Sequence, residues 1–302
     1  MDKKLLKHIS EQKYEKLSES AIEVIQNFNR KSIHQFRVSY KELRAFLRMV
    51  SIGKKKGSKL NVSKKINHAY CLAGKIRGLQ LQLQKMHKTV SYHNEDEQYA
   101  GMLKKEIEKN KSGLLDRLHK NNIPTNQKKT TKKLPMEFTA SDLEKFAELM
   151  WARISICIQE IDVDQNMHML RKNLKDLYYV HGIYSAINED ESTRILWKGI
   201  DQKYIKECID ALGNLQDSTV AIALLDRLPD RKNHSSDNIQ LKRLKKKWLA
   251  YKISKRKLIL NQVRTKLVRP QYPIMTFYHI CFESKCEESL IICKETRLIS
   301  KP

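Results

Sequence analysis

Long apolar runs are missing from this sequence. No segment approaches the ~20 apolar residues that a membrane-spanning helix requires, and we expect no membrane span. The N-terminal stretch, residues 1–17, also lacks the apolar core of a secretory signal peptide. These absences exclude the usual membrane-targeting signals, and they predict a soluble protein of the cytoplasm.

Paired cysteines are missing as well. The six cysteines include no Cys-x-x-Cys pair, and three of them stand singly within helical apolar patterns. This usage predicts reduced thiols rather than a disulfide framework. Near the C-terminus, His279, Cys281, Cys286 and Cys293 could supply metal ligands, but their spacing fits no standard zinc pattern. We therefore predict no metal and no cofactor.

Acidic residues are few relative to basic ones. The chain has 34 Asp and Glu against 59 Lys and Arg, which gives a formal net charge of +25. Such an excess predicts an anionic partner: nucleic acid, an acidic membrane surface or a phosphate-rich polymer. The 302 residues, of which 40% are apolar, can bury a sizeable core and fit one large or two ordinary domains.

Helical periodicity runs through most of the chain and predicts an all-α protein. We expect helices over residues 1–29, 33–50, 61–87, 95–120, 141–161, 164–187, 193–228 and 236–267. Ser32 is the expected N-cap of the second helix, and Ser141 with Glu144 forms the expected capping box of the fifth. No convincing alternating strand precedes residue 270, and the tail, residues 268–302, is left unassigned.

A polar segment bounded by prolines divides the chain. Residues 122–135 contain several lysines and favour a flexible charged linker: Lys128, Lys129, Lys132 and Lys133. We therefore predict an N-terminal helical half over residues 1–121 and a C-terminal helical half over residues 136–267.

Residues 33–48 carry two rows of side chains when they are drawn as a helix. Basic residues recur at spacings of three and four and form one continuous row: His34, Arg37, Lys41, Arg44 and Arg48. Apolar residues follow the same rhythm about a third of a turn away: Phe36, Tyr40, Leu43, Leu47 and Val50. Aligned cations repel one another by ~0.2–0.5 kcal/mol per pair. The basic row therefore predicts a bound anion.

The same pattern occurs a second time in residues 167–180. Its basic residues stand at the offsets of the first three in the earlier row: His168, Arg171 and Lys175. The apolar partners also match: Leu170, Leu174 and Leu177. Each copy is followed at a similar distance by a pair of small residues and an apolar helix, at residues 73–86 and 212–225. Repeated features in the same order predict duplicated halves.

These motifs together resemble the CHAD domain, the conserved histidine α-helical domain. The first copy reads H-x-x-R-V-x-x-K-x-L-R, the second reads H-x-L-R-K-x-x-K-x-x-Y-Y, and L-G-x-x-x-D follows the second. The resemblance covers roughly residues 10–265. It implies two related four-helix bundles with pseudo-two-fold symmetry around a basic channel, and binding of inorganic polyphosphate without cleavage.

The chain departs from the family pattern at three positions. Glu42 stands where the family usually has a second consecutive Arg, and Tyr178 stands where Arg is common. Gly78 replaces the acidic residue that the second half retains as Asp217. We expect Asp217 to orient a neighbouring Arg or Lys. Such domains are often fused or adjacent to triphosphate-tunnel enzymes, so association with such an enzyme or with polyphosphate granules is a further expectation.

Rows of cations suit a polymer that carries about one charge per phosphate and offers no bases to recognise. Arg binds two phosphate oxygens with a planar fork, and Lys acts as a mobile point charge. Helical neighbours three and four apart lie ~5–6 Å from one another. The candidate polyphosphate-binding residues are His34, Arg37, Lys41, Arg44, Arg48, Lys75, Arg77, His168, Arg171, Lys172, Lys175, Lys242 and Lys246.

Two other function classes stay open. Rows of cations also neutralise DNA or RNA, although seven Phe and three Trp offer little for base stacking and no standard nucleic-acid-binding motif is present. A phosphate-processing enzyme is less favoured. The sequence shows no P-loop, no paired-carboxylate motif and no Glu-x-Glu-x-Lys signature of a triphosphate-tunnel domain. We expect a binding protein for inorganic polyphosphate or other polyanions, not an enzyme.

Overall fold

The computed structural model describes residues 1–54, 59–89, 94–161, 164–226 and 235–267. Within these residues the only β pairing is an isolated bridge between Asp2 and Glu137, and the prediction of an all-α fold is confirmed. The helices are α1 (Lys3–Gln26), α2 (Arg30–Val50), α3 (Lys64–Thr89), α4 (Asn94–Lys120), α5 (Ile123–Thr131), α6 (Ala140–Gln159), α7 (Asp164–Tyr184), α8 (Glu189–Trp197), α9 (Gln202–Leu225) and α10 (Ser235–Lys266).

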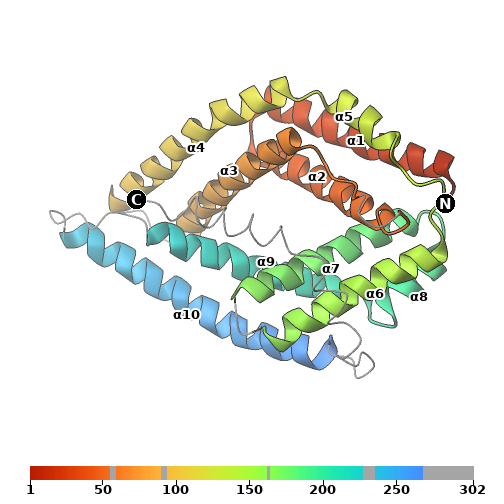
Figure 1. Ribbon diagram of the computed structural model, residues 1–302. Coiled ribbons are helices and arrows are strands. Elements are labelled where there is room, and N and C mark those ends of the chain that lie inside the picture. The colour runs from red at the N-terminus through yellow and green to blue at the C-terminus, as the bar shows by residue number, and fades with distance from the viewer. Residues whose placement is uncertain (55–58, 90–93, 162–163, 227–234, 268–302) are drawn as a thin grey trace.

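The helices form two groups, with α1–α5 above and α6–α10 below in the view of Figure 1. In the first group α1 packs on α2, α2 on α3, and α3 on α4; in the second, α6 packs on α7, α7 on α9, and α9 on α10. The same order of neighbours therefore occurs twice. Between the groups, α2 contacts α7 and α3 contacts α9. The two helices that carry the basic patterns thus lie side by side at the centre, while a two-fold axis between the groups stays a prediction.

The apolar row of α2 is buried, as its spacing predicts. Its members are between 0 and 3% exposed: Phe36, Tyr40, Leu43, Leu47 and Val50. The matching leucines of α7 are fully buried: Leu170, Leu174 and Leu177. Full burial of such a side chain contributes ~1.5–3 kcal/mol. One continuous apolar core joins both groups and fixes which face of α2 and of α7 is left for the basic row.

Both predicted helix caps were wrong by a few residues. Asn29, not Ser32, caps α2: its side-chain oxygen accepts from the backbone N–H of Ser32 at 2.9 Å, while the Ser32 hydroxyl accepts from the Asn29 N–H at 3.2 Å. Ser32 is therefore the third helical residue of a capping box. In α6, Thr139 and Asp142 make the equivalent pair in place of Ser141 and Glu144. The earlier start of α2 extends its basic face by one turn.

The single helix predicted over residues 193–228 is broken into α8 and α9. Lys198 adopts a left-handed conformation with φ of 48°, and Gly199 follows with φ of 84°. Asp201 then caps α9 by accepting from the Lys203 backbone N–H at 2.8 Å. The break lets the end of α8 fold back against α6, where the Trp151 indole N–H donates to the Leu196 carbonyl at 2.8 Å.

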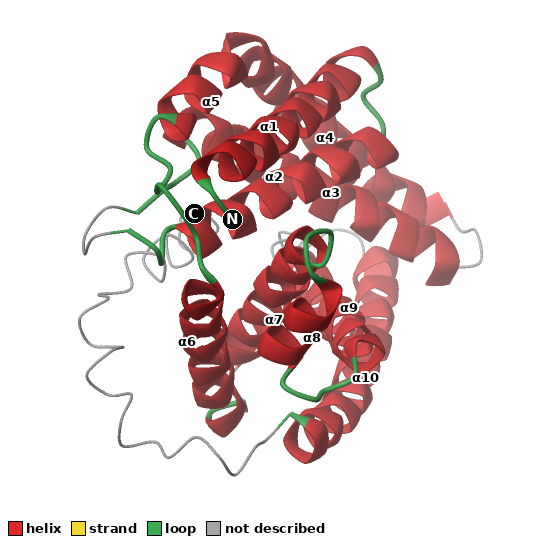
Figure 2. Cartoon of the chain, turned by 90° about the vertical axis from the view of Figure 1, so that its right-hand side faces the viewer, coloured by secondary structure: helices red, strands yellow, loops and turns green. Residues whose placement is uncertain are grey.

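The segment predicted as a flexible linker contains a helix. α5 is capped by Asn122, whose side chain accepts from the Thr125 N–H at 2.9 Å, and a proline occupies the first helical turn. The hydroxyls of Tyr14 and Thr130 are hydrogen-bonded at 2.8 Å and join α5 to α1. The amino group of Met1 donates to the Phe138 carbonyl at 2.7 Å, so the N-terminus lies at the connection between the two groups (Figure 2).

Three further predictions concern membrane spans, the cysteines and the C-terminal tail. No helix in the described ranges is long and apolar enough to cross a membrane. Cys157 and Cys208 are buried thiols on α6 and α9. The metal-ligand candidates near the C-terminus belong to the unassigned tail, residues 268–302, which lies outside the described residues.

Candidate functional site

The basic rows of α2 and α7 converge. The pKa of Lys41 on α2 is lowered to about 6, first by burial and then by nearby cations of both helices: Arg37, Lys175, Arg171 and Arg44. The pKa of His168 on α7 is lowered to about 4, again by burial first and then by cations of both helices: Lys172, Arg171, Arg44 and Lys41. Charges from the two halves of the chain therefore act on one another at close range.

A third helix adds to the same group of charges. Burial is the first cause that lowers the pKa of His34, and the Arg77 guanidinium of α3 is the second. Most of the predicted residues are thus brought together, and we call this set the cation cluster: His34, Arg37, Lys41, Arg44, Arg77, His168, Arg171, Lys172 and Lys175.

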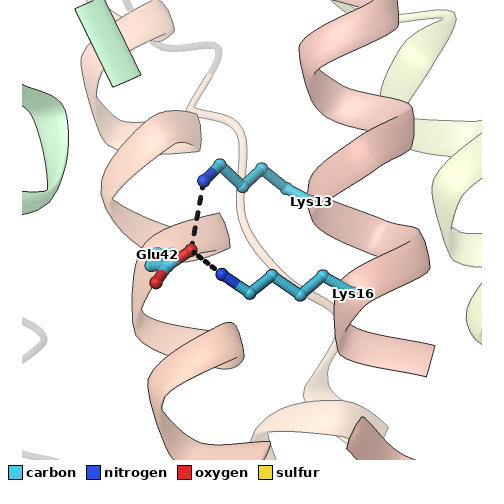
Figure 3. A network of polar contacts seen from close by, with 3 residues as sticks. All are labelled: Lys13, Lys16 and Glu42. Carbon is cyan, nitrogen blue, oxygen red and sulfur yellow. Dashed lines mark hydrogen bonds and ion pairs between the residues drawn. The ribbon is translucent and has the colours of Figure 1, made fainter. Parts of the chain in front are cut away.

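Few carboxylates neutralise the cation cluster. Asp210 and Asp217 of α9 both favour the charged form of Lys175, yet burial and the nearby arginines still lower its pKa to about 8. Glu42 of α2 is bound instead by two lysines of α1, with Oε2 lying 3.1 Å from Lys13 Nζ and 3.2 Å from Lys16 Nζ (Figure 3). The positive charge of the cluster is therefore only partly balanced.

Backbone carbonyls and aromatic rings hold the arginines in place. Arg37 Nη1 donates to the carbonyl oxygen of Tyr70 on α3 at 2.9 Å, and its guanidinium carbon lies 4.5 Å from the centre of the Tyr70 ring. The Tyr70 ring in turn stacks on Tyr40, with 4.0 Å between ring centres. In the second half, Arg171 Nε donates to the carbonyl oxygen of Ile209 on α9 at 3.2 Å. Each arginine thus bridges from a basic helix to the next long helix of its own half.

Three nitrogens of the cation cluster are buried and have no hydrogen-bond partner in the described part of the chain: Arg44 Nε, Arg77 Nη1 and His168 Nδ1. A buried polar group without a partner costs about 1–3 kcal/mol. Natural folds keep few such groups, and functional sites are among the places where they persist. The three atoms come from α2, α3 and α7, and further buried atoms without a partner lie elsewhere in the described chain, such as Ser10 Oγ on α1 and Trp248 Nε1 on α10.

Four predicted residues have other neighbours. Arg48 forms an ion pair with the buried Asp176 and links α2 to α7. Lys75 binds Glu106 of α4 at 2.7 Å, because it lies about 200° around α3 from Arg77 and faces away from the cluster. The remaining two predicted residues are exposed on α10 and are not members of the cation cluster: Lys242 and Lys246.

Two basic residues beside the cluster were not among those predicted from the sequence. Arg30 acts on Arg77, whose pKa is lowered first by burial and then by Arg30. It stands four residues before His34 and continues the basic row, a signal that was lost because the helix was predicted to begin after Ser32. Lys85 stands eight residues after Arg77 and is in electrostatic contact with Asp217. Positions eight apart share a helix face, so this signal was also present in the sequence.

The charge state of Lys41 makes stability depend on pH. Its folded pKa of about 6 lies below the ordinary 10.5, so between these values the unfolded chain binds a proton that the folded chain does not. The contribution of Lys41 to the free energy of unfolding therefore rises with pH across this window. Replacing Lys41 by Met should stabilise the protein at pH 6 by on the order of 1 kcal/mol or more, since each unit of lowered pKa costs about 1.4 kcal/mol.

Urea denaturation of wild type and Lys41→Met across this window measures the effect. We expect the gain to shrink as pH rises towards 10.5. Lys129→Met, at an exposed position of α5, is the control and should leave the pH dependence of the wild type unchanged. Equal pH dependence of the stability of wild type and Lys41→Met would show that folding does not lower the pKa of Lys41.

Fold and cluster together define an all-α protein in which basic side chains of two helix groups converge. The chain belongs to the CHAD domain family, whose model matches residues 8–226. A crystal structure of the CHAD domain from the plant Ricinus communis aligns with it at 14% identity and a TM-score of 0.60, covering 88% of this chain and 92% of that one. This similarity shows a common fold. No curated protein matches the sequence.

Proposed function

We propose that this protein binds inorganic polyphosphate without cleaving it and that the cation cluster is the binding site. The observation that carries the proposal is the convergence of basic side chains from α2, α3 and α7 with few carboxylates among them. Burial and then the neighbouring cations lower the pKa of Lys41 to about 6, so its charged form is unfavourable until an anion lies beside it. The resemblance of the sequence to polyphosphate-binding CHAD domains supports the same ligand.

The types of side chain suit a phosphate polymer. The guanidinium groups of Arg37 and Arg171 are held by backbone carbonyls, so their remaining N–H groups can face two oxygens of one phosphate at once. Lys41 and Lys175 are each in electrostatic contact with both arginines and supply cations without a fixed direction. A bound polyanion also favours the protonated form of both lysines, so binding takes up protons from solution.

Nucleic acid is the competing ligand, and the aromatic residues argue against it. Single-stranded nucleic acid is usually held by bases that stack on free aromatic faces. Here Tyr40 stacks on Tyr70, and the Arg37 guanidinium lies over the Tyr70 ring. These rings support arginines instead of presenting a platform for bases, so we expect no preference for DNA or RNA.

A competition experiment tests the proposal. Labelled polyphosphate is bound to the full chain at near-physiological salt, and unlabelled polyphosphate, single-stranded DNA and heparin of equal charge compete for it. We expect polyphosphate to displace the label at the lowest concentration. The logarithm of the affinity should fall linearly with the logarithm of salt concentration, because binding releases counterions.

Two results would contradict this function. DNA that competes as well as polyphosphate would favour general polyanion or nucleic-acid binding.

A separate assay tests for cleavage. Polyphosphate is incubated with protein and Mg²⁺, and its chain length is followed by gel electrophoresis. If the wild type shortens the polyphosphate chain and the double variant Arg37→Ala, Arg171→Ala does not, the protein is an enzyme.

A further inference from the structure

Gly74 of α3 lies directly against the guanidinium group of Arg37. A Cβ atom at this position would lie 3.1 Å from the guanidinium carbon of Arg37 and closer still to Nη1. Ordinary contacts of a Cβ atom lie at 3.4 Å or more. Any residue larger than glycine would therefore occupy the space in which the Arg37 guanidinium reaches the Tyr70 carbonyl.

Gly213 of α9 has the same relation to Arg171. A Cβ atom there would lie 2.8 Å from Nη2 and 3.0 Å from Nε of Arg171, the nitrogen that donates to the Ile209 carbonyl. In both halves the glycine stands four residues after the carbonyl acceptor, Tyr70 in one helix and Ile209 in the other. The two contacts are thus built in the same way from different stretches of sequence.

The spacing of four has a geometric reason. In an α-helix the carbonyl of residue i already accepts from the N–H of residue i+4, and the side chain of residue i+4 is tilted back over that carbonyl. At Gly74 and Gly213 the arginine of the neighbouring helix occupies the place that a Cβ atom of residue i+4 would take, so a second donor reaches the carbonyl there by this route. Glycine in a helix interior is otherwise unfavourable relative to alanine, and at these two positions the adjacent arginine gives a reason for its presence.

We propose that Gly74 and Gly213 are positioning residues, each of which leaves the space where an arginine of the basic row is held against a backbone carbonyl so that its guanidinium faces phosphate in a fixed orientation. The inference rests on the proposed function, and it adds how the site favours bidentate phosphate binding. An arginine that is fixed before binding loses less conformational freedom on binding.

Alanine substitution separates this role from a structural one. Gly74→Ala and Gly213→Ala, alone and together, change neither the net charge nor the number of arginines. The added methyl group meets the far end of a flexible side chain, so the helix can keep its place while the arginine moves. Gly101→Ala and Gly182→Ala are matched controls, because a Cβ atom at either position would meet nothing within 4 Å.

We expect all of these variants to fold, because the preference of alanine for the helix offsets part of the loss of the arginine contact. The affinity for labelled polyphosphate should fall about twofold to tenfold for each of Gly74→Ala and Gly213→Ala, whereas the controls bind like the wild type. In an Arg37→Ala background, Gly74→Ala should cause no further loss, because the arginine that it positions is already absent.

A second measurement does not depend on polyphosphate. An arginine-selective dicarbonyl reagent, read out by mass spectrometry, should modify Arg37 faster in Gly74→Ala than in wild type, because the displaced guanidinium loses its carbonyl partner and its place over Tyr70.

The outcomes distinguish this inference from the function beneath it. Wild type that fails to bind polyphosphate overturns the proposed function and the inference together. Wild-type binding that both alanine variants retain in full overturns the inference alone. An equal loss from Gly74→Ala with and without Arg37 would also overturn it, since the effect would then not act through the arginine.

Discussion

Replacing Arg37 and Arg171 together by alanine should weaken polyphosphate binding by about tenfold or more, whereas replacing Lys129 and Lys132 should change it little. Each pair removes two positive charges. The arginines are held in place by hydrogen bonds to the Tyr70 and Ile209 carbonyls. Each hydrogen bond from such a guanidinium to phosphate should contribute about 1.5–3 kcal/mol to binding. A loss of about 1.4 kcal/mol corresponds to a tenfold change in affinity.

The lysines serve as a charge-matched control. Lys129 on α5 and Lys132 at its C-cap are exposed, and fixing such a side chain on a ligand costs about 0.5–1.5 kcal/mol. Titrations of both variants at the same salt concentration give the comparison, after circular dichroism has shown that both remain helical. An equal loss of affinity in the two variants would mean that only net charge matters and that the cation cluster is not the site.

Replacing Asp176 by alanine should lower the free energy of unfolding by about 3 kcal/mol. Asp176 on α7 is 2% exposed and forms an ion pair with Arg48 on α2, whose side chain is 20% exposed. Removing one partner of a buried pair leaves the other charge in a poorly hydrated place. The pair lies where the two helix groups meet, so its loss weakens the contact that brings the basic rows together.

Urea denaturation measures this effect, with Asp116→Ala as control. Asp116 forms an exposed ion pair with Lys120 on the surface of α4, and such pairs contribute about 0.2–1 kcal/mol. Replacing Arg48 by Met and Asp176 by Leu together should recover most of the stability, because apolar side chains of similar size can substitute for a buried pair. A loss in Asp176→Ala no larger than in the control would show that the pair does not hold the two groups together.

Local sequence signals were ambiguous where several polar residues compete to cap one helix. Asn29 and Ser32 can both begin α2, and Thr139 competes with Ser141 at the start of α6. At α2 the upstream residue caps because Ser32 is needed at the third helical position to bind the cap in return. At α6 Thr139 caps because Asp142, and not Ser141, stands at that third position. The error at α2 had a consequence for the site, since it removed Arg30 from the predicted basic row.

Other boundaries depended on packing between distant segments. α5 was predicted as a linker because residues 122–135 are polar, yet the contact between Tyr14 and Thr130 holds it against α1. The end of α8 at Lys198 was missed although Gly199, which has a positive φ, is a helix-ending signal in the sequence. The left-handed residue follows directly on the end of α8 that is hydrogen-bonded to Trp151 of α6.

The sequence by itself determined the helical class, the family and the two rows of basic residues. It could do so because helical periodicity and repeated offsets involve residues close together in the chain. Tertiary structure decided which cations converge: it brought Arg77 to the rows of α2 and α7, paired Arg48 with Asp176, and turned Lys75 towards Glu106. The lowered pKa of Lys41 and the glycine beneath each arginine were likewise decided there. Burial, charge interaction and steric space depend on distances between helices, and no pattern along one helix contains those distances.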